Sequence, residues 1–142
     1  MTDARLAIVV LAAGSGTRMK SALPKVLHPI AGVPMIGHVL SAATSLSPAH
    51  TVVVVRHERD QVVSAVTELT EGVLIVDQDE IPGTGRAVEV AVAALGDFDG
   101  DVVVVSGDVP LLDVATLESL LDPHLSGGFA TTILTAIVED PS

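Results

Sequence analysis

Residues 6–16 read Leu-Ala-Ile-Val-Val-Leu-Ala-Ala-Gly-Ser-Gly, an uninterrupted apolar run that ends in two closely spaced glycines. The run does not alternate between apolar and polar residues, as a strand with one solvated face would. Similar runs, rich in valine, recur at residues 51–55, 73–76 and 102–105. Runs of this kind indicate strands that are covered on both faces, as in a parallel sheet.

Segments with a helical pattern separate these runs, with apolar side chains at spacings of three and four. We expect four helices, at residues 35–46, 58–69, 85–95 and 113–121. Gly96 is placed to close the third, and Asp113 and Pro123 are placed to begin and end the fourth. This alternation predicts an α/β fold: a Rossmann-like, doubly wound, mostly parallel sheet with helices on both faces.

The domain organisation follows from the length. The 142 residues are enough for one domain with a buried core. A fifth β-prone run at residues 131–138 stands just before the last residue, with no closing element after it. It is either an edge strand or a sign that residues 1–142 are the front part of a longer domain, and we favour the second interpretation.

The composition excludes several functions. There are 18 Asp and Glu against 7 Lys and Arg, a net charge of −11, no Trp or Tyr, and two Phe. An acidic chain almost without stacking rings is a poor partner for nucleic-acid polymers. The absence of cysteine excludes disulfides, thiolate metal sites and cysteine nucleophiles. No apolar run approaches the ~20 residues that span a bilayer, so we expect no membrane partner and a cytoplasmic location.

The loop after the first run is the first candidate site. Its glycines allow the backbone to turn sharply near a ligand, and successive amides there suit phosphate oxygens. Arg18, Lys20 and Lys25 gather positive charge in this otherwise acidic chain, which favours an anionic ligand. Two known phosphate-binding loops do not match this one. A dinucleotide-binding fingerprint has a third glycine where this chain has Met19, and a P-loop has a Gly-Lys-Ser sequence that is missing here. A tight turn with solvated charges is the alternative.

Here the sequence resembles a known family. Leu-Ala-Ala-Gly-Ser-Gly-Thr-Arg-Met at residues 11–19, followed by Leu-Pro-Lys-Val-Leu at 23–27, is similar to the signature of sugar-1-phosphate nucleotidylyltransferases. The continuation to Gly32 resembles the uridylyltransferase domain of the bacterial bifunctional enzymes that make UDP-N-acetylglucosamine. The resemblance implies transfer of UMP from UTP to N-acetylglucosamine-1-phosphate, for cell-wall precursor synthesis. Residues 1–142 would be the N-terminal nucleotide-binding part of such a domain, with the nucleotidyltransferase fold incomplete at its C-terminus.

Two later loops carry further candidates. Gln78 follows the third run, and its amide can both donate to and accept from a base edge, although an exposed turn residue is the alternative. Asp108 follows the fourth run, where its hard carboxylate oxygens suit Mg²⁺, although it could also cap a turn before Pro110. In the family, the loop that corresponds to Gln78 is a uracil-binding segment, which implies nucleotide contacts for Gln78, Gly83 and Thr84. The family has a metal ligand at the position of Asp108, which implies that Asp108 binds Mg²⁺.

The resemblance also implies the remaining roles. Arg18 and Lys25 would act as catalytic residues that balance phosphate charge. The nucleotide would be bound by the first loop through Leu11, Ala12, Ala13, Gly14, Gly16 and Lys25. The family's sugar-binding glycine, glutamate and asparagine, its second metal ligand, and the acetyltransferase domain through which full-length relatives form trimers all lie outside this chain.

Other functions stay open at this point. A related enzyme could use another donor and sugar phosphate, such as dTTP with glucose-1-phosphate, and a truncated chain could bind nucleotide without catalysis. A response-regulator-like domain is disfavoured, because glycines and Arg18 stand where acidic residues would follow its first strand. His28 is assigned to packing, and the other histidines to the surface or to helix ends: His38, His50, His57 and His124. Asp97, Asp99 and Asp101 are interpreted as a solvated turn.

Overall fold

The computed structural model describes residues 3–16 and 19–140. Its centre is a four-stranded sheet in the order β5-β4-β1-β6, with every neighbouring pair parallel. The strands are β1 (Asp3–Ala12), β4 (Pro48–Val55), β5 (Leu74–Asp77) and β6 (Asp101–Ser106). The four strands expected from the valine-rich runs are therefore all present, and the mostly parallel sheet is confirmed.

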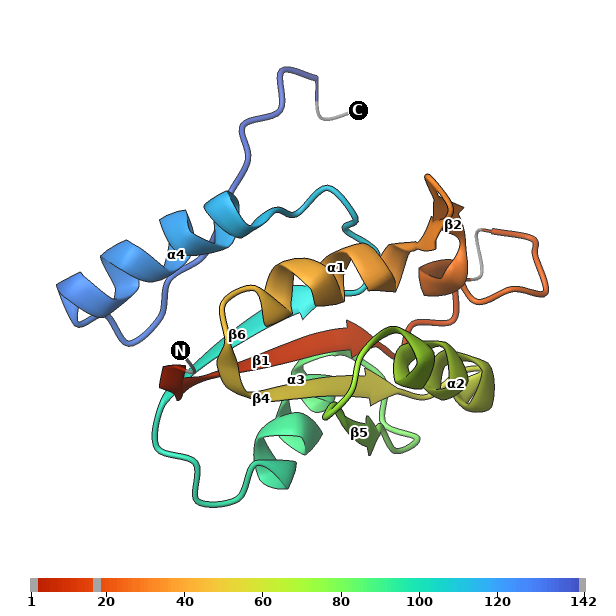
Figure 1. Ribbon diagram of the computed structural model, residues 1–142, viewed down its shortest axis with the longest axis horizontal. Helices are drawn as coiled ribbons and strands as arrows, with labels where there is room; N and C mark the ends of the chain where they lie inside the picture. Colours follow the sequence, from red (N-terminus) through yellow and green to blue (C-terminus); the bar gives the residue numbers. More distant parts are fainter. Residues whose placement is uncertain (1–2, 17–18, 141–142) are drawn as a thin grey trace.

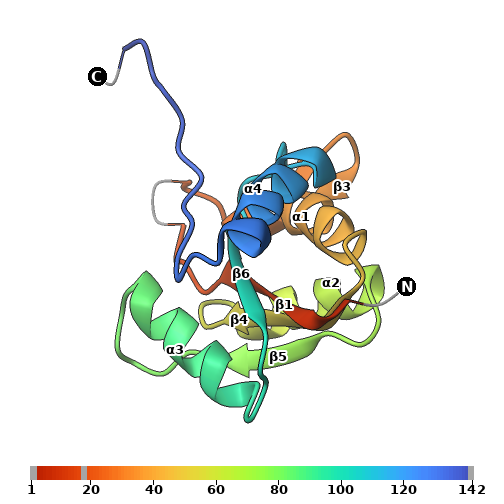
Figure 2. The same ribbon diagram turned by 90° about the vertical axis from the view of Figure 1, so that its left-hand side faces the viewer.

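Helices cover both faces of this sheet (Figures 1 and 2). One face is packed by α1 (Met35–Thr44), α2 (Arg59–Leu69) and α4 (Val114–Gly127), and the other by α3 (Thr84–Ala94). Alternate side chains of β1 pack on opposite faces of the sheet, because successive side chains of a strand point in opposite directions. Ile8 and Val10 pack with α1, α2 and α4, whereas Val9 packs with Ala87 and Ala91 of α3. Buried on both faces, the central strands need the continuous apolar runs seen in the sequence.

A short segment connects β1 to α1. It contains the 3-10 turn η1 (Lys25–Leu27) and a small antiparallel hairpin of β2 (Pro29–Ile30) and β3 (Val33–Pro34). Ala31 and Gly32 both have positive φ, at 52° and 81°, as a tight hairpin turn requires. The sequence analysis did not predict this hairpin. Val26 and Leu27 of η1 are buried, and this anchors the neighbouring Lys25.

The expected fifth strand at residues 131–138 is absent, and this part of the prediction was wrong. The segment has no regular secondary structure and leads away from the sheet after α4 (Figure 1). Its first residues, up to Leu134, line an apolar cleft between β6 and α4 instead of joining the edge of β6. Ile133 and Ile137 are 76% and 100% exposed. A β-prone sequence becomes a strand only where a sheet edge pairs with it, since strand preference depends mainly on context.

The fourth helix also differs from its prediction. Asp113 is its N-cap, as expected, and its side chain accepts a hydrogen bond from the Thr116 backbone N–H. The helix does not end before Pro123 but continues through it to Gly127. Gly128, at φ 61°, provides the left-handed conformation that ends it. The proline removes one N–H donor, but buried Leu117 and Leu121 hold the helix against the sheet.

Candidate functional site

An open cleft of about 520 Å³ lies at the carboxyl ends of the four parallel strands. This is where ligands collect in open α/β sheets, because every strand delivers its following loop to the same edge. Every residue that has a predicted role and lies in the described part of the chain lines this cleft. These residues are Leu11, Ala12, Ala13, Gly14, Gly16, Lys25, Gln78, Gly83, Thr84 and Asp108. Arg18 lies outside the described residues. The structure therefore brings the predicted residues together, while their individual roles stay predictions.

The first loop lies close against Lys25. Gly16 has φ 58°, a left-handed conformation that favours glycine. A Cβ atom at Gly16 would lie 2.9 Å from Cβ of Lys25, closer than such atoms approach in proteins. The glycine thus permits both the turn and the close approach of the loop to the lysine.

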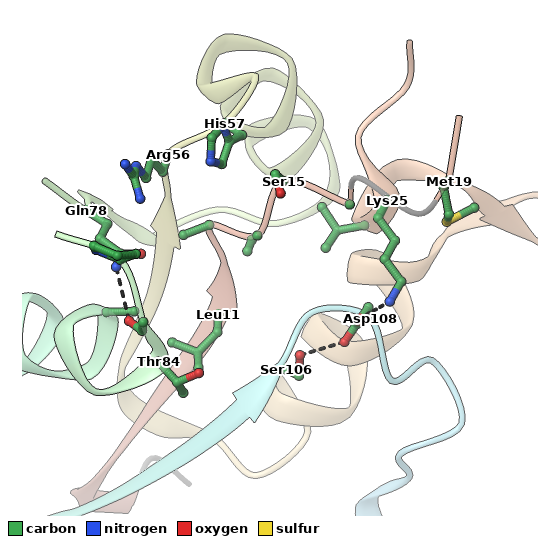
Figure 3. A pocket seen from close by; sticks show the side chains of 18 residues that line it. Leu11, Ser15, Met19, Lys25, Arg56, His57, Gln78, Thr84, Ser106 and Asp108 are labelled. Carbon is green, nitrogen blue, oxygen red and sulfur yellow. Dashed lines mark hydrogen bonds and ion pairs between the residues drawn. The ribbon is translucent and has the colours of Figure 1, made fainter. Parts of the chain in front are cut away.

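Lys25, Ser106 and Asp108 form what we call the charged end of the cleft (Figure 3). Nζ of Lys25 lies 2.6 Å from Oδ2 of Asp108, and the hydroxyl of Ser106 donates to Oδ1 at 2.6 Å. The hydrogen bond from Lys25, followed by that from Ser106, holds the pKa of Asp108 below its usual range. Both charged side chains remain partly exposed, at 42% and 27%. The pair is therefore accessible to a ligand in the cleft.

Asp108 is also the candidate metal ligand. The described part of the chain contains no group of three or more His, Cys, Asp or Glu side chains placed to hold an ion. A closed protein cage is thus not formed by these residues. Mg²⁺ does not need one, because it is commonly held by one or two carboxylates together with substrate phosphates and water. The ionised, partly exposed carboxylate of Asp108 fits that kind of site.

Gln78 lies at the opposite end of the cleft, which we call the base end together with the loop at residues 79–83 (Figure 3). Its backbone N–H donates to Val55 O at 2.9 Å, and the residue is only 9% exposed. Its side-chain Nε2 donates to Ile81 O at 2.9 Å and to Gly83 O at 3.1 Å. The amide N–H groups are thus bonded to the loop itself, and a ligand base would have to use Oε1 or replace one of these bonds.

The loop leads directly into α3. Gly83, at φ 111°, is the N-cap of this helix and supplies no side-chain cap. Thr84 is the first residue of the helix and lines the cleft. The first backbone N–H groups of a helix have no intrahelical partner and carry partial positive charge. This end of α3 can donate hydrogen bonds to oxygen atoms of a ligand.

Two arginines support the base end from outside the predicted set. Arg86 of α3 pairs with Asp79 and also donates to Glu89 at 2.8 Å. The hydrogen bond from Arg86 is the main reason that the pKa of Asp79 is lowered. Arg56, just after β4, donates from Nη2 to Glu80 O at 3.1 Å. The loop at 79–83 has no regular secondary structure, and both arginines contact it.

Sequence reasoning missed some residues of the cleft. Arg56 and His57 line it, although the sequence analysis gave Arg56 no role and placed His57 at the surface or at a helix end. Their position directly after a predicted strand was the signal that could have found them. His124 lies in the last turn of α4, at a helix end as expected, 2.9 Å from Thr132 Oγ1 and 3.3 Å from Asp101 Oδ1. The prediction of a solvated turn was wrong for Asp101, which is the first residue of β6 and is half-buried.

No helix among the described residues is long and apolar enough to cross a bilayer.

Comparison with known proteins gives consistent results. The chain is 62% identical over 138 residues to a protein of Clavibacter sepedonicus named Bifunctional protein GlmU, and 64% identical over 138 residues to the protein of the same name from Leifsonia xyli subsp. xyli. Each match covers 96% of this chain and 28% of the relative, so the chain spans less than a third of these proteins.

Solved structures show the same fold. Rv0371c from Mycobacterium tuberculosis H37Rv superimposes with a TM-score of 0.72 at 25% identity, covering 89% of this chain and 63% of that one. A nucleotidyl transferase from Methanothermobacter thermautotroptrophicus (Mth528) gives a TM-score of 0.69 at 28% identity, covering 82% and 56%. Residues 8–137 match the family described as the MobA-like NTP transferase domain. The chain belongs to this family of NTP transferase domains.

Proposed function

We propose that this chain forms the nucleotide-binding part of a uridylyltransferase site, which transfers UMP from UTP to N-acetylglucosamine-1-phosphate. The observation that carries the proposal is that one cleft combines a hydrogen-bonding base end around Gln78 with a charged end at Lys25 and Asp108. A nucleoside triphosphate has the matching parts, a flat polar base and a chain of anionic phosphates. The high identity to proteins named Bifunctional protein GlmU supports the uridylyl donor and the sugar-phosphate acceptor.

In the proposed reaction, a phosphate oxygen of the sugar phosphate attacks the α-phosphorus of UTP. The bond between that phosphorus and the bridging oxygen breaks, and pyrophosphate leaves with the electron pair. Such a displacement depends on alignment and charge neutralisation more than on a protein nucleophile. Lys25, and Arg18 by the family resemblance, would balance phosphate charge, and the amides of the first loop would bind along the nucleotide.

The charged end must rearrange for this to happen. In the structure, Lys25 and Asp108 neutralise each other in an ion pair. Binding of UTP would transfer Lys25 to a phosphate and release Asp108 to hold Mg²⁺. When bound, the metal supplies charge neutralisation on the phosphates and the leaving group. Because the same two side chains serve both ligands, we expect UTP and Mg²⁺ to bind cooperatively.

The rest of the proposal concerns the parts of the relatives that this chain does not cover. The sugar-binding residues, a second metal ligand and any trimer contacts would come from regions outside these 142 residues. The product would be UDP-N-acetylglucosamine for cell-wall synthesis, made in the cytoplasm. The chain alone would provide nucleotide binding, with turnover requiring the remaining residues.

The proposal is tested by titrating the chain with UTP in the presence of Mg²⁺, beside CTP, ATP and dTTP, in a calorimeter. We expect selective binding of UTP that weakens in Gln78→Ala. The matched control is Gln61→Ala, an exposed glutamine on α2 that contacts Glu58 outside the cleft. Equal binding of all four nucleotides, or no binding by the folded chain, would contradict the assignment. Preference for dTTP would indicate the related enzymes with another donor.

A further inference from the structure

Arg56 is a cation of the cleft to which the proposed function gives no role. It follows the last residue of β4 and lines the cleft on the same side as Gln78, away from Lys25 and Asp108 (Figure 3). Its guanidinium donates from Nη2 to Glu80 O at 3.1 Å. The residue that follows one strand thus contacts, through its side chain, the backbone of the loop that follows the neighbouring strand.

The role of this hydrogen bond is clear from a comparison with the other contacts of the base end. The side-chain bonds of Gln78 run to Ile81 and Gly83, within the same stretch of chain. Asp79 accepts from the Ile81 backbone N–H at 3.2 Å and pairs with Arg86 of the helix that follows. These contacts fold the loop upon itself and onto α3. Gln78 itself is bound to β4 through its backbone N–H and Val55 O, and the bond from Arg56 extends this attachment to Glu80 within the loop.

The chemistry of the side chain suits this task. A guanidinium carries five N–H donors in a rigid plane, so one bond to a carbonyl leaves other donors free to act on neighbouring acceptors. Its positive charge also lies near Asp79 and contributes to lowering the pKa of that carboxyl. A neutral or flexible side chain at this position would lack the fixed geometry, the charge or both.

We propose that Arg56 is a positioning residue for nucleotide binding, which holds the loop at residues 79–83 against β4 so that Gln78 and Gly83 keep the shape that receives the base. This inference rests on the proposed function, and it adds a residue to the base end. Loss of Arg56 therefore acts on recognition of the base and ribose and leaves the charged end unchanged.

The test compares Arg56→Ala and Arg56→Lys with the unmodified chain, using UTP with Mg²⁺ and uridine without metal. We expect Arg56→Ala to weaken binding of UTP and uridine by a similar factor, on the order of 10-fold, which is typical for loss of a hydrogen bond that involves a charged group. Arg56→Lys should restore part of the affinity. The Mg²⁺ dependence of UTP binding should not change.

Arg59→Ala is the matched control. Arg59 is the first residue of α2 and pairs with Asp77 and Asp60, but it does not line the cleft. Removing it deletes an arginine and its ion pairs close to the same strands. Since Asp77 is itself held in the sheet opposite Val55, the loop should keep its position and UTP affinity should stay within about 2-fold, as expected for an exposed ion pair.

Hydrogen exchange without ligand gives an independent readout. The backbone amides of Glu80, Ile81 and Gly83 should exchange faster in Arg56→Ala than in the unmodified chain or in Arg59→Ala. Unchanged exchange would overturn the proposal even if UTP did not bind at all, so its failure is distinct from failure of the proposed function. Loss of UTP affinity with uridine affinity intact would also overturn it, because Arg56 would then act on the phosphates.

Discussion

The two ends of the cleft are held together by different kinds of interaction. At the charged end, Lys25 and Asp108 are 83 residues apart in the sequence and meet through an ion pair between partly exposed side chains. At the base end, Gln78 forms short-range hydrogen bonds to the loop that follows it and is almost fully buried. The base end is therefore preformed. At the charged end, Lys25 and Asp108 pair with each other, and a ligand would have to replace this ion pair. Substitutions at the two ends should have different consequences for different parts of the ligand.

The largest effect is expected from Asp108→Asn. This change keeps the shape of the side chain and removes the charge that would hold Mg²⁺. The Mg²⁺-dependent part of the UTP affinity should disappear, and turnover by a longer protein that contains this site should fall about 100-fold or more, as for loss of one preorganised electrostatic contact. Calorimetry with and without Mg²⁺ measures the first effect, and pyrophosphate release measures the second.

The control for this change is Asp97→Asn, which removes an exposed carboxylate outside the cleft. It should leave both measurements unaltered. A Mg²⁺ dependence that survives in Asp108→Asn would show that another group holds the metal.

A smaller effect is expected from Lys25→Met, which keeps the length of the side chain without its charge. UTP affinity should fall about 10-fold, in the range for a charge-assisted hydrogen bond, while uridine binding should change little. The substitution also lets the pKa of Asp108 rise toward its usual range, because the hydrogen bond from Lys25 is the main cause of its lowering.

This shift has a consequence for stability. A carboxyl whose pKa is lowered by folding stabilises the fold above its unfolded pKa, and the contribution is lost as the pH falls through the folded value. The unmodified chain should therefore be the more stable of the two at neutral pH. The difference should shrink below about pH 4, where this carboxyl begins to take up a proton in the unfolded chain but is still ionised in the folded unmodified chain. Urea unfolding at a series of pH values measures this, and a gap that widens in acid would contradict the ion pair.

The smallest effect on binding is expected from Gly16→Ala. Alanine at φ 58° is strained, and its Cβ would lie 2.9 Å from Cβ of Lys25, so the loop and the lysine must both shift. We expect about 1–2 kcal/mol of lost stability, typical for a residue forced into the left-handed region, and a several-fold loss of UTP affinity. Thermal unfolding and calorimetry measure the two effects.

Gly14→Ala is the paired control, because a Cβ at Gly14 would have no atom within 4 Å and its φ is not positive. It should fold as stably as the unmodified chain. Equal destabilisation by both changes would show that the close contact with Lys25 is unimportant.

Much of the fold could be predicted because the central strands carry its strongest signal. Val9 and Val53 are both fully buried, on opposite faces of the sheet, so no polar side chain interrupts the runs that contain them. The segment at residues 131–138 has a similar composition but forms no strand, since pairing depends on a neighbouring edge and not on composition. Pro123 likewise suggested a helix end, but the packing of Leu121 and the left-handed Gly128 decided otherwise.

The part of the site that lies directly after the parallel strands could be predicted from the sequence. Gln78 and Asp108 follow strands directly, so a parallel sheet had to bring them to one edge. The ion pair between Lys25 and Asp108 could not be predicted in the same way, because it depends on where η1 places the lysine. The contact of Arg56 with a backbone carbonyl has no sequence pattern at all, since any residue type supplies that carbonyl.

The most direct test of the two-ended cleft is a titration of uridine, UMP and UTP into the unmodified chain, Gln78→Ala and Asp108→Asn, all with Mg²⁺. The account predicts that Gln78→Ala weakens binding of all three ligands by a similar factor, while Asp108→Asn weakens UTP strongly and leaves uridine unchanged. If Asp108→Asn weakened uridine as much as UTP, or Gln78→Ala affected UTP alone, the two ends would not recognise the separate parts of one nucleotide and the account would be wrong.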